Sequence, residues 1–217
     1  MKTVILSAFG RFGNYPANST ELIAKKLNGT RLSGVKIHSA IFDCVIPQNN
    51  RGEVLFSLAK RIGATGVICL GMASDKKGLC VELTTKNAVD SKYCPPEINR
   101  TPIRHSLAYE HSLGLDLTAW NIPHFESECE KELIPLLTSN DPGAFCCNHL
   151  MFQLRMLQLE EAQFSRIPFI YIHIPCSQEA VVDRAEHKSL GKSIMPIDQV
   201  IKGLDILIRN ATLPKHI

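Results

Sequence analysis

Apolar and polar positions along the chain follow two alternating patterns. Residues 3–7 and 66–71 and the segment Phe169–Ile174 are nearly continuous apolar runs, which are typical of short strands buried on both faces. Residues 35–38 alternate between apolar and polar and predict a further strand. Apolar residues recur at helical spacing over Ser19–Leu27 and over residues 52–62, 150–159 and 197–208, which predicts amphipathic helices there.

Buried strands that alternate with amphipathic helices are the pattern of a parallel sheet covered by helices on each side. We therefore expect an α/β fold, a three-layer α/β/α sandwich around a mainly parallel central sheet. No repeat, low-complexity tract or flexible linker divides the sequence, so residues 1–217 are expected to form a single domain. Residues 93–139 are less regular, and Trp120, Pro123 and His124 indicate an excursion from the sheet rather than another regular unit.

Composition and charge narrow the class of protein. A hydrophobic share of 45% and a charged share of 21% are those of a globular chain and exclude a disordered, collagenous or coiled-coil protein. A net charge of +3 without a basic cluster gives no reason to expect a nucleic acid or a membrane as partner. The longest apolar run, residues 167–175, is far shorter than the ~20 residues of a membrane span. The first apolar run is also shorter than the ~7–15 residues of a secretion signal, so we expect a cytoplasmic protein.

The eight cysteines do not form a metal-binding pattern. They contain no CxxC pair and no cysteine–histidine spacing typical of zinc. Several lie inside apolar runs, as Cys69 does. We expect reduced thiols that mostly pack as small core residues.

Three of the predicted strands end in unusual loops. The first is followed by Phe9 and the glycine-containing residues 10–14, the second by residues 71–75, and the third carries His173 just before Pro175. Because the carboxyl ends of parallel strands meet at one edge of a sheet, we expect these three loops to face a common cleft.

Cys146 and Cys147 follow a turn-forming segment and precede an apolar helix. A cysteine in the first turn of a helix lies near the positive end of the helix dipole and near unpaired N–H groups, which lower its pKa and favour a nucleophilic thiolate. Buried cysteines are common, however, so this segment taken alone favours two packing residues over a nucleophile.

His173 and Glu82 each allow two interpretations. A histidine inside an apolar strand is most often a core residue bonded to a carbonyl, but a cysteine nucleophile needs a base of this kind. Glu82 is either a solvated strand residue or the carboxylate that orients such a base. Spacing does not decide between these alternatives. His149 points away from Cys147 at helical spacing and is interpreted as structural.

Four segments in order resemble the pyroglutamyl peptidase type I family, the pyrrolidone-carboxylate peptidases. They are LSAFGRFG at residues 6–13 with Asn18, GMA at residues 71–73 with Val81, Glu82 and Asn87, PGAFCCNHLM at residues 142–151, and IHIP at residues 172–175. The third segment is the most specific, and the four together span nearly the whole chain.

The resemblance implies a thiol protease with Cys147 as nucleophile, His173 as base and Glu82 as orienting acid. It further implies an α/β/α fold, a dimer or tetramer of identical chains, a cytoplasmic setting, and neither metal nor cofactor. The substrate would be a peptide whose N-terminus is blocked by a pyroglutamyl residue. The residues implied in binding the lactam ring are Phe9, Phe12, Asn18, Met72, Phe145 and Cys146.

The chain departs from the family pattern around this pocket. Gly10 and Arg11 replace Glu-Pro, Met72 replaces glutamine, and Lys76 and Lys92 stand where arginines are expected. Arginine and lysine are not equivalent where a fork of donors is used. Two alternatives therefore remain open: an amidase for another N-terminal acyl group, which the changed rim at Met72 and Lys76 would distinguish, or a homologue that binds without turnover. The adjacent thiols also predict sensitivity to oxidation.

Overall fold

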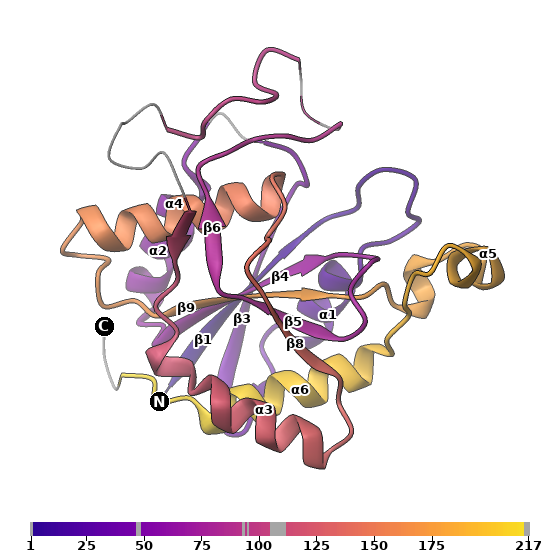
Figure 1. The fold of residues 1–217 in the computed structure, drawn as a ribbon. Helices are drawn as coiled ribbons and strands as arrows, with labels where there is room; N and C mark the ends of the chain where they lie inside the picture. Colours follow the sequence, from indigo (N-terminus) through magenta and orange to yellow (C-terminus); the bar gives the residue numbers. More distant parts are fainter. Residues whose placement is uncertain (1, 47–48, 93, 95, 105–111, 215–217) are drawn as a thin grey trace.

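A seven-stranded sheet forms the centre of the molecule in the computed structural model, which describes residues 2–46, 49–92, 94, 96–104 and 112–214 (Figure 1). The strand order is β2-β3-β1-β4-β9-β5-β8. The strands are β1 (Thr3–Phe9), β2 (Arg31–Leu32), β3 (Val35–Phe42), β4 (Gly66–Met72), β5 (Leu79–Glu82), β8 (Leu136–Ser139) and β9 (Phe169–Ile174). Strands β3, β1, β4 and β9 are mutually parallel, whereas β2 and β5 run antiparallel to β3 and β9. The expected mainly parallel sheet is confirmed.

Helices cover both faces of this sheet. They are α1 (Ser19–Leu27), α2 (Arg51–Ile62), α3 (Ile122–Lys131), α4 (Cys146–Glu160) and α6 (Ile197–Asn210), whereas α5 (Arg184–Ser189) lies away from the sheet (Figure 1). The apolar faces of α2 and α4 pack on one side of the sheet, and those of α1, α3 and α6 pack on the other (Figure 1). The three-layer sandwich predicted from the alternating pattern is therefore confirmed.

The alternation of side chains along β9 shows how the sheet serves both cores. Ile170, Ile172 and Ile174 belong to the core beneath α1, α3 and α6. Phe169 and Tyr171 belong to the core beneath α2 and α4. Because side chains alternate with a period of two, His173 lies on the same side as Tyr171 and faces α4.

Residues at both ends of the helices explain where the helices begin and stop. Asn18 caps α1, since its side-chain oxygen accepts a hydrogen bond from the backbone N–H of Thr20 at 3.0 Å. Asn50 caps α2 in the same way through the N–H of Glu53, and Gly63 ends α2 with a left-handed φ of 63°. Helix α4 begins four residues before the predicted start and has no side-chain cap, so its first N–H groups remain available.

The predicted excursion of residues 93–139 from the sheet is wrong for its second half. Trp120 is fully buried, α3 packs against α6, and β8 pairs in parallel with β5 at the edge of the sheet. The sequence pattern was weak here because α3 buries only Phe125 and Cys129, and β8 is four residues long. In the first half, β7 (Ser112–Gly114) pairs with β6 (Thr84–Lys86) in a separate two-stranded sheet. Tyr93 and residues 105–111 lie outside the described residues.

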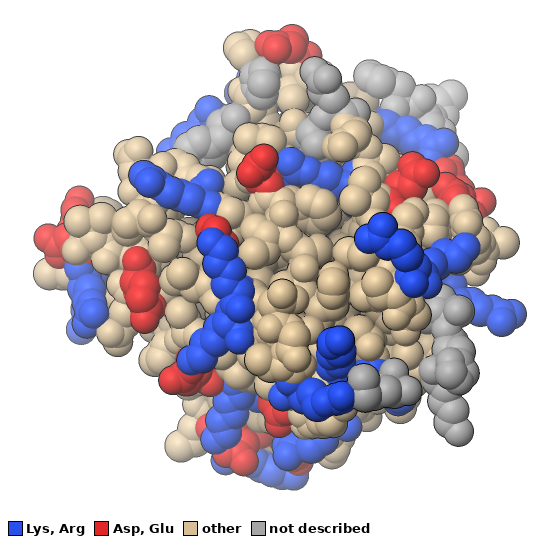
Figure 2. Space-filling view, turned by 180° about the vertical axis from the view of Figure 1, so that it is seen from behind, with Lys and Arg blue, Asp and Glu red and all other residues tan. Residues whose placement is uncertain are grey.

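Charged side chains of both signs are interspersed over the molecular face in Figure 2, which agrees with the low net charge. Within the part of the chain that the structure describes, no helix combines the length and apolar character needed to span a membrane.

Candidate active site

The side chains of Cys147, His173 and Tyr171 meet around Gly71 at the end of β4. A Cβ atom at Gly71 would lie 2.9 Å from the Cys147 sulfur, 2.7 Å from Cδ2 of His173 and 2.7 Å from the Tyr171 hydroxyl oxygen. Glycine is therefore required for these three side chains to come together. The cysteine is the second residue of α4, and the histidine precedes the last residue of β9.

Glu82 completes this cluster from β5. His173 Nδ1 lies 2.7 Å from Oε1 of Glu82, whose side chain is fully buried. The register pairs Cys80 with His173, so Glu82, two residues further along, lies on the same face of the sheet as the imidazole. A ring N–H at Nδ1 donates to the carboxylate and leaves Nε2 for Cys147. Lys76 Nζ lies 3.9 Å from the same carboxylate oxygen.

The cluster favours a charged pair of thiolate and imidazolium. A hydrogen bond from the Cys146 thiol lowers the pKa of Cys147 well below its usual range against the opposing effect of burial, and His173 and the Tyr171 hydroxyl act in the same direction. Burial lowers the pKa of His173, but hydrogen bonds to Cys147 and Glu82 outweigh it and raise that pKa to about 9. The lowered pKa of Cys147 favours the thiolate form that a nucleophile needs.

The two adjacent cysteines have different environments. Cys146 is buried, its sulfur lies 3.0 Å from the sulfur of Cys44, and burial raises its pKa well above the usual value. Cys147 instead faces His173. All eight cysteines are free thiols. Cys146 is thus a buried thiol packed against Cys44, whereas Cys147 lies beside a histidine.

A cavity of about 160 Å³ opens above Cys147 and His173. All six residues implied in ring binding line it: Phe9, Phe12, Asn18, Met72, Phe145 and Cys146. The ends of β1, β4 and β9 meet here, as expected for the predicted common cleft. The amide of Asn18 holds the surrounding loop, since its Nδ2 donates to the Gly10 carbonyl at 2.9 Å and its oxygen caps α1. The Met72 sulfur accepts hydrogen bonds from Ser19 at 3.3 and 3.4 Å.

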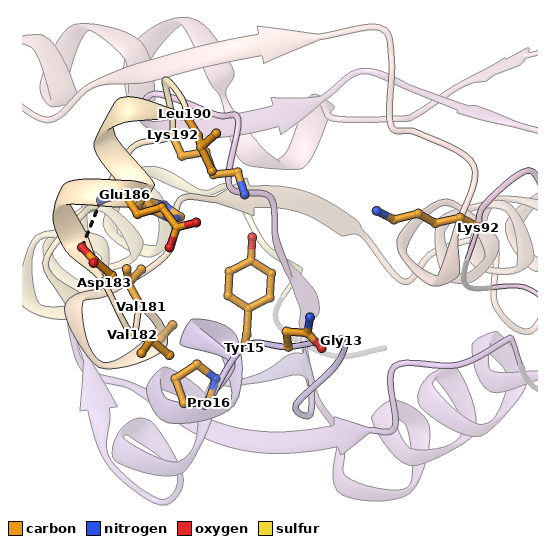
Figure 3. A pocket seen from close by; sticks show the side chains of 13 residues that line it. Gly13, Tyr15, Pro16, Lys92, Val181, Val182, Asp183, Glu186, Leu190 and Lys192 are labelled. Carbon is orange, nitrogen blue, oxygen red and sulfur yellow. Dashed lines mark hydrogen bonds between the residues drawn. The ribbon is translucent and has the colours of Figure 1, made fainter.

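The basic residues of the predicted rim do not gather at this cavity. Arg11 is exposed, Lys76 lies against Glu82, and Lys92 lines a second cavity of about 570 Å³. The loop of residues 13–16 and the segment 180–192 form most of that second cavity, and Lys92 reaches into it from the opposite side (Figure 3).

Four residues beside the cluster were not identified from the sequence. Tyr171 was detectable in principle, because it shares a strand face with His173. Gly71 belongs to the GMA segment but was given no role of its own, and Cys44 carries no such signal. Asn148 joins the first turn of α4 to β6: its oxygen accepts from Thr85 and from the N–H of Lys86, and its Nδ2 donates to the Lys86 carbonyl at 2.8 Å.

His149 has the structural character expected for it. It is buried, and burial together with the charge of Arg51 lowers its pKa to about 4, so it is neutral at physiological pH. Among the described residues, no group of three or more histidine, cysteine or acidic side chains is arranged to hold a metal ion.

Comparison with known proteins relates this chain to a family. The family model described as pyroglutamyl peptidase matches residues 2–213. A pyrrolidone-carboxylate peptidase of Streptococcus pneumoniae (strain 70585) is 26% identical over 212 residues, covering 94% of this chain and 90% of the relative. One of Bacillus licheniformis is 28% identical over 205 residues, with the same coverage.

Solved structures show the same fold. Pyroglutamyl peptidase I from Bacillus amyloliquefaciens superposes with a TM-score of 0.80 at 24% identity, covering 99% of this chain and 97% of the other. A mutant pyrrolidone carboxyl peptidase from Pyrococcus furiosus gives a TM-score of 0.77 at 20% identity, covering 96% and 97%. Since the family model spans almost the whole sequence, the chain belongs to the pyroglutamyl peptidase family of cysteine peptidases.

Proposed function

We propose that this chain removes N-terminal pyroglutamyl residues from peptides, with Cys147 as nucleophile, His173 as general acid and base, and Glu82 as the orienting carboxylate. The observation that carries the proposal is the contact of Cys147 with the His173–Glu82 pair beneath a small, largely apolar cavity. A site of this kind suits attack by a thiolate on an amide carbonyl.

The reaction follows from the arrangement of these groups. The Cys147 thiolate attacks the carbonyl carbon between the lactam ring and the next residue. The N–H groups of the first turn of α4, which have no partner within the helix, stabilise the negative charge that develops on the carbonyl oxygen. His173 then donates its proton to the departing amine, and a water molecule activated by His173 hydrolyses the acyl-enzyme. Glu82 keeps the imidazole oriented throughout.

The cavity suits the ring of the substrate. Its volume of about 160 Å³ is below the ~300–1,000 Å³ of most ligand pockets, so it accepts a small group. Phe9, Phe12 and Phe145 supply apolar walls for an uncharged lactam. By analogy with the family, we further propose that residues 1–217 act as one domain, in a homo-oligomer, in the cytoplasm.

The test is release of a fluorescent amine from a pyroglutamyl arylamide. We expect turnover by the wild type and by Cys146→Ala, and its loss in Cys147→Ala. If the wild type shows no turnover but Cys147 is alkylated rapidly at neutral pH, the enzyme acts on a different N-terminal acyl group. A panel of other N-acyl amides then identifies the substrate. Absence of both turnover and rapid alkylation would contradict any catalytic role.

A further inference from the structure

The small cavity above Cys147 leaves most of a peptide substrate without a binding site. At about 160 Å³, it has room for a ring but not for the residues that follow the scissile bond. Those residues must lie against another part of the surface. The second cavity, about 570 Å³, falls within the ~300–1,000 Å³ range of ligand pockets.

The two cavities share a wall. Phe12 lines the small cavity, and its ring centroid lies 5.6 Å from that of Tyr15, which lines the large one. Met72, on the small-cavity side, belongs to the same apolar cluster as Ala180 and Val181, on the large-cavity side. A single layer of packed side chains therefore separates the large cavity from the small one.

A backbone hydrogen bond also connects the opposite wall of the large cavity to the wall of the small one. Lys92 points into this cavity from the side facing Tyr15 (Figure 3). Two residues earlier, the N–H of Asp90 donates to the carbonyl of Ala144 at 2.9 Å, and Ala144 lines the small cavity. The segment that follows His173 along the chain supplies the remaining wall, including Val182.

The lining suits a peptide. Tyr15, Pro16, Val181 and Val182 offer apolar surface. Charged groups of both signs stand around it: Lys192 lies 6.0 Å from the centre of the Tyr15 ring, and Glu186 points inward from α5 (Figure 3). Mixed apolar and charged walls match a chain of alternating side chains and polar backbone better than a uniformly charged ligand.

We propose that the large cavity binds the part of the substrate on the leaving side of the scissile bond. The inference rests on the proposed function and extends it to a substrate class: pyroglutamyl peptides with at least two residues beyond the ring. Contacts made in this cavity supply binding energy that a short arylamide lacks, so extended peptides are the better substrates.

The test compares kcat/KM for a pyroglutamyl tetrapeptide amide with kcat/KM for a pyroglutamyl arylamide. Val182→Trp fills the large cavity with a bulky ring, and Val54→Trp places the same residue on the exposed side of α2 as a matched control; the two valines are 83% and 50% exposed. We expect the ratio of kcat/KM for the tetrapeptide amide to kcat/KM for the arylamide to fall at least tenfold in Val182→Trp. In Val54→Trp this ratio should stay at the wild-type value. Equal ratios in both variants would overturn the proposal.

If the proposed function itself is wrong, the kinetic result differs from the one that overturns the role of the large cavity. The wild type would then hydrolyse neither substrate. In that case, calorimetric titration of the tetrapeptide amide into the Cys147→Ala protein, with and without Val182→Trp, tests the cavity by itself. Binding that Val182→Trp weakens at least tenfold supports the large cavity as a peptide site, and binding that it leaves unchanged overturns it.

Discussion

Glu82 and His173 lie 91 residues apart in the sequence, yet their side chains are 2.7 Å apart because β5 inserts antiparallel beside β9. The pairing of these two strands thus brings a buried carboxylate against the imidazole. The carboxylate has no exposure to solvent, so its negative charge acts on the ring with little screening. The contact accounts for part of the raised pKa of His173.

Replacing Glu82 with glutamine keeps the shape of this contact and removes its charge. We expect kcat/KM to fall by about 10²–10⁴-fold, because the imidazolium loses its counter-charge and the ring its preferred orientation. The pKa of His173 falls as well. A pH profile of kcat/KM in which the upper limb moves to lower pH distinguishes this effect from misfolding, which would lower activity equally at every pH.

The wild-type pH profile of kcat/KM should have two limbs. Activity rises with pH as Cys147 loses its proton, well below the usual cysteine range, and falls near pH 9 as His173 loses the proton that the leaving amine needs. Cys146→Ala removes the hydrogen bond that contributes most to lowering the pKa of Cys147, so the lower limb moves to higher pH. An unmoved lower limb in Cys146→Ala would show that the neighbouring thiol does not stabilise the thiolate.

Gly71 sets the distance between the reacting groups. In Gly71→Ala the new methyl group would meet the Cys147 sulfur and the His173 ring at less than 3.0 Å, so one of them must move. Since a displacement of about 1 Å can cost about 10²-fold in rate, we expect a loss of this size in kcat. Gly114→Ala, where the methyl group meets nothing within 4 Å, is the matched control and should retain activity. Thermal unfolding checks that both variants fold.

The strands that build the floor of the site were predictable, because β1, β4 and β9 are buried on both faces and read as apolar runs. The position of β5 was not. A strand of four residues carries little periodicity, and nothing in its sequence reveals that it lies between β9 and β8, antiparallel to β9 and parallel to β8. For this reason the pairing of Glu82 with His173 followed only from the family resemblance.

The start of α4 was also not predictable from the sequence pattern. Residues 146–149 have cysteine, asparagine and histidine side chains, so the apolar spacing becomes regular only at Leu150. The helix nevertheless begins at Cys146, because Asn148 is held by hydrogen bonds to β6 and its flank. Long-range contacts also explain why Cys44 was missed: it follows β3 and meets Cys146 only through the fold.

The lowered pKa of His149 predicts how the free energy of unfolding depends on pH. Its pKa is about 4 in the folded protein and 6.5 for an ordinary histidine, so between these values the unfolded chain binds a proton that the folded chain does not. Stability is therefore lost as pH falls from about 6.5 to about 4, by on the order of 3 kcal/mol. Urea unfolding at several pH values measures the slope, and His149→Gln should remove most of it. An identical slope in that variant would assign the acid sensitivity to other groups.

The thiol pair of Cys44 and Cys146 predicts a reversible response to oxidation. The two sulfurs are 3.0 Å apart, and Cys44 lines the cavity through which a small oxidant reaches the site. Hydrogen peroxide oxidises the Cys44 thiol to a sulfenic acid with release of water, and the Cys146 thiol then condenses with it to form a disulfide and a second water. The Cys146 proton that stabilises the Cys147 thiolate is lost in this step, so the pKa of Cys147 rises until a reductant restores both thiols.

Peptide mapping without reductant tests this response independently of any substrate. In Cys147→Ala, which lacks the nucleophile but keeps the pair, peroxide should yield a linked peptide containing Cys44 and Cys146 that disappears on reduction. In Cys147→Ala that also carries Cys44→Ser, no such link forms. If both cysteines of the Cys147→Ala protein remain open to alkylation after peroxide treatment, the pair is a packing contact without redox chemistry.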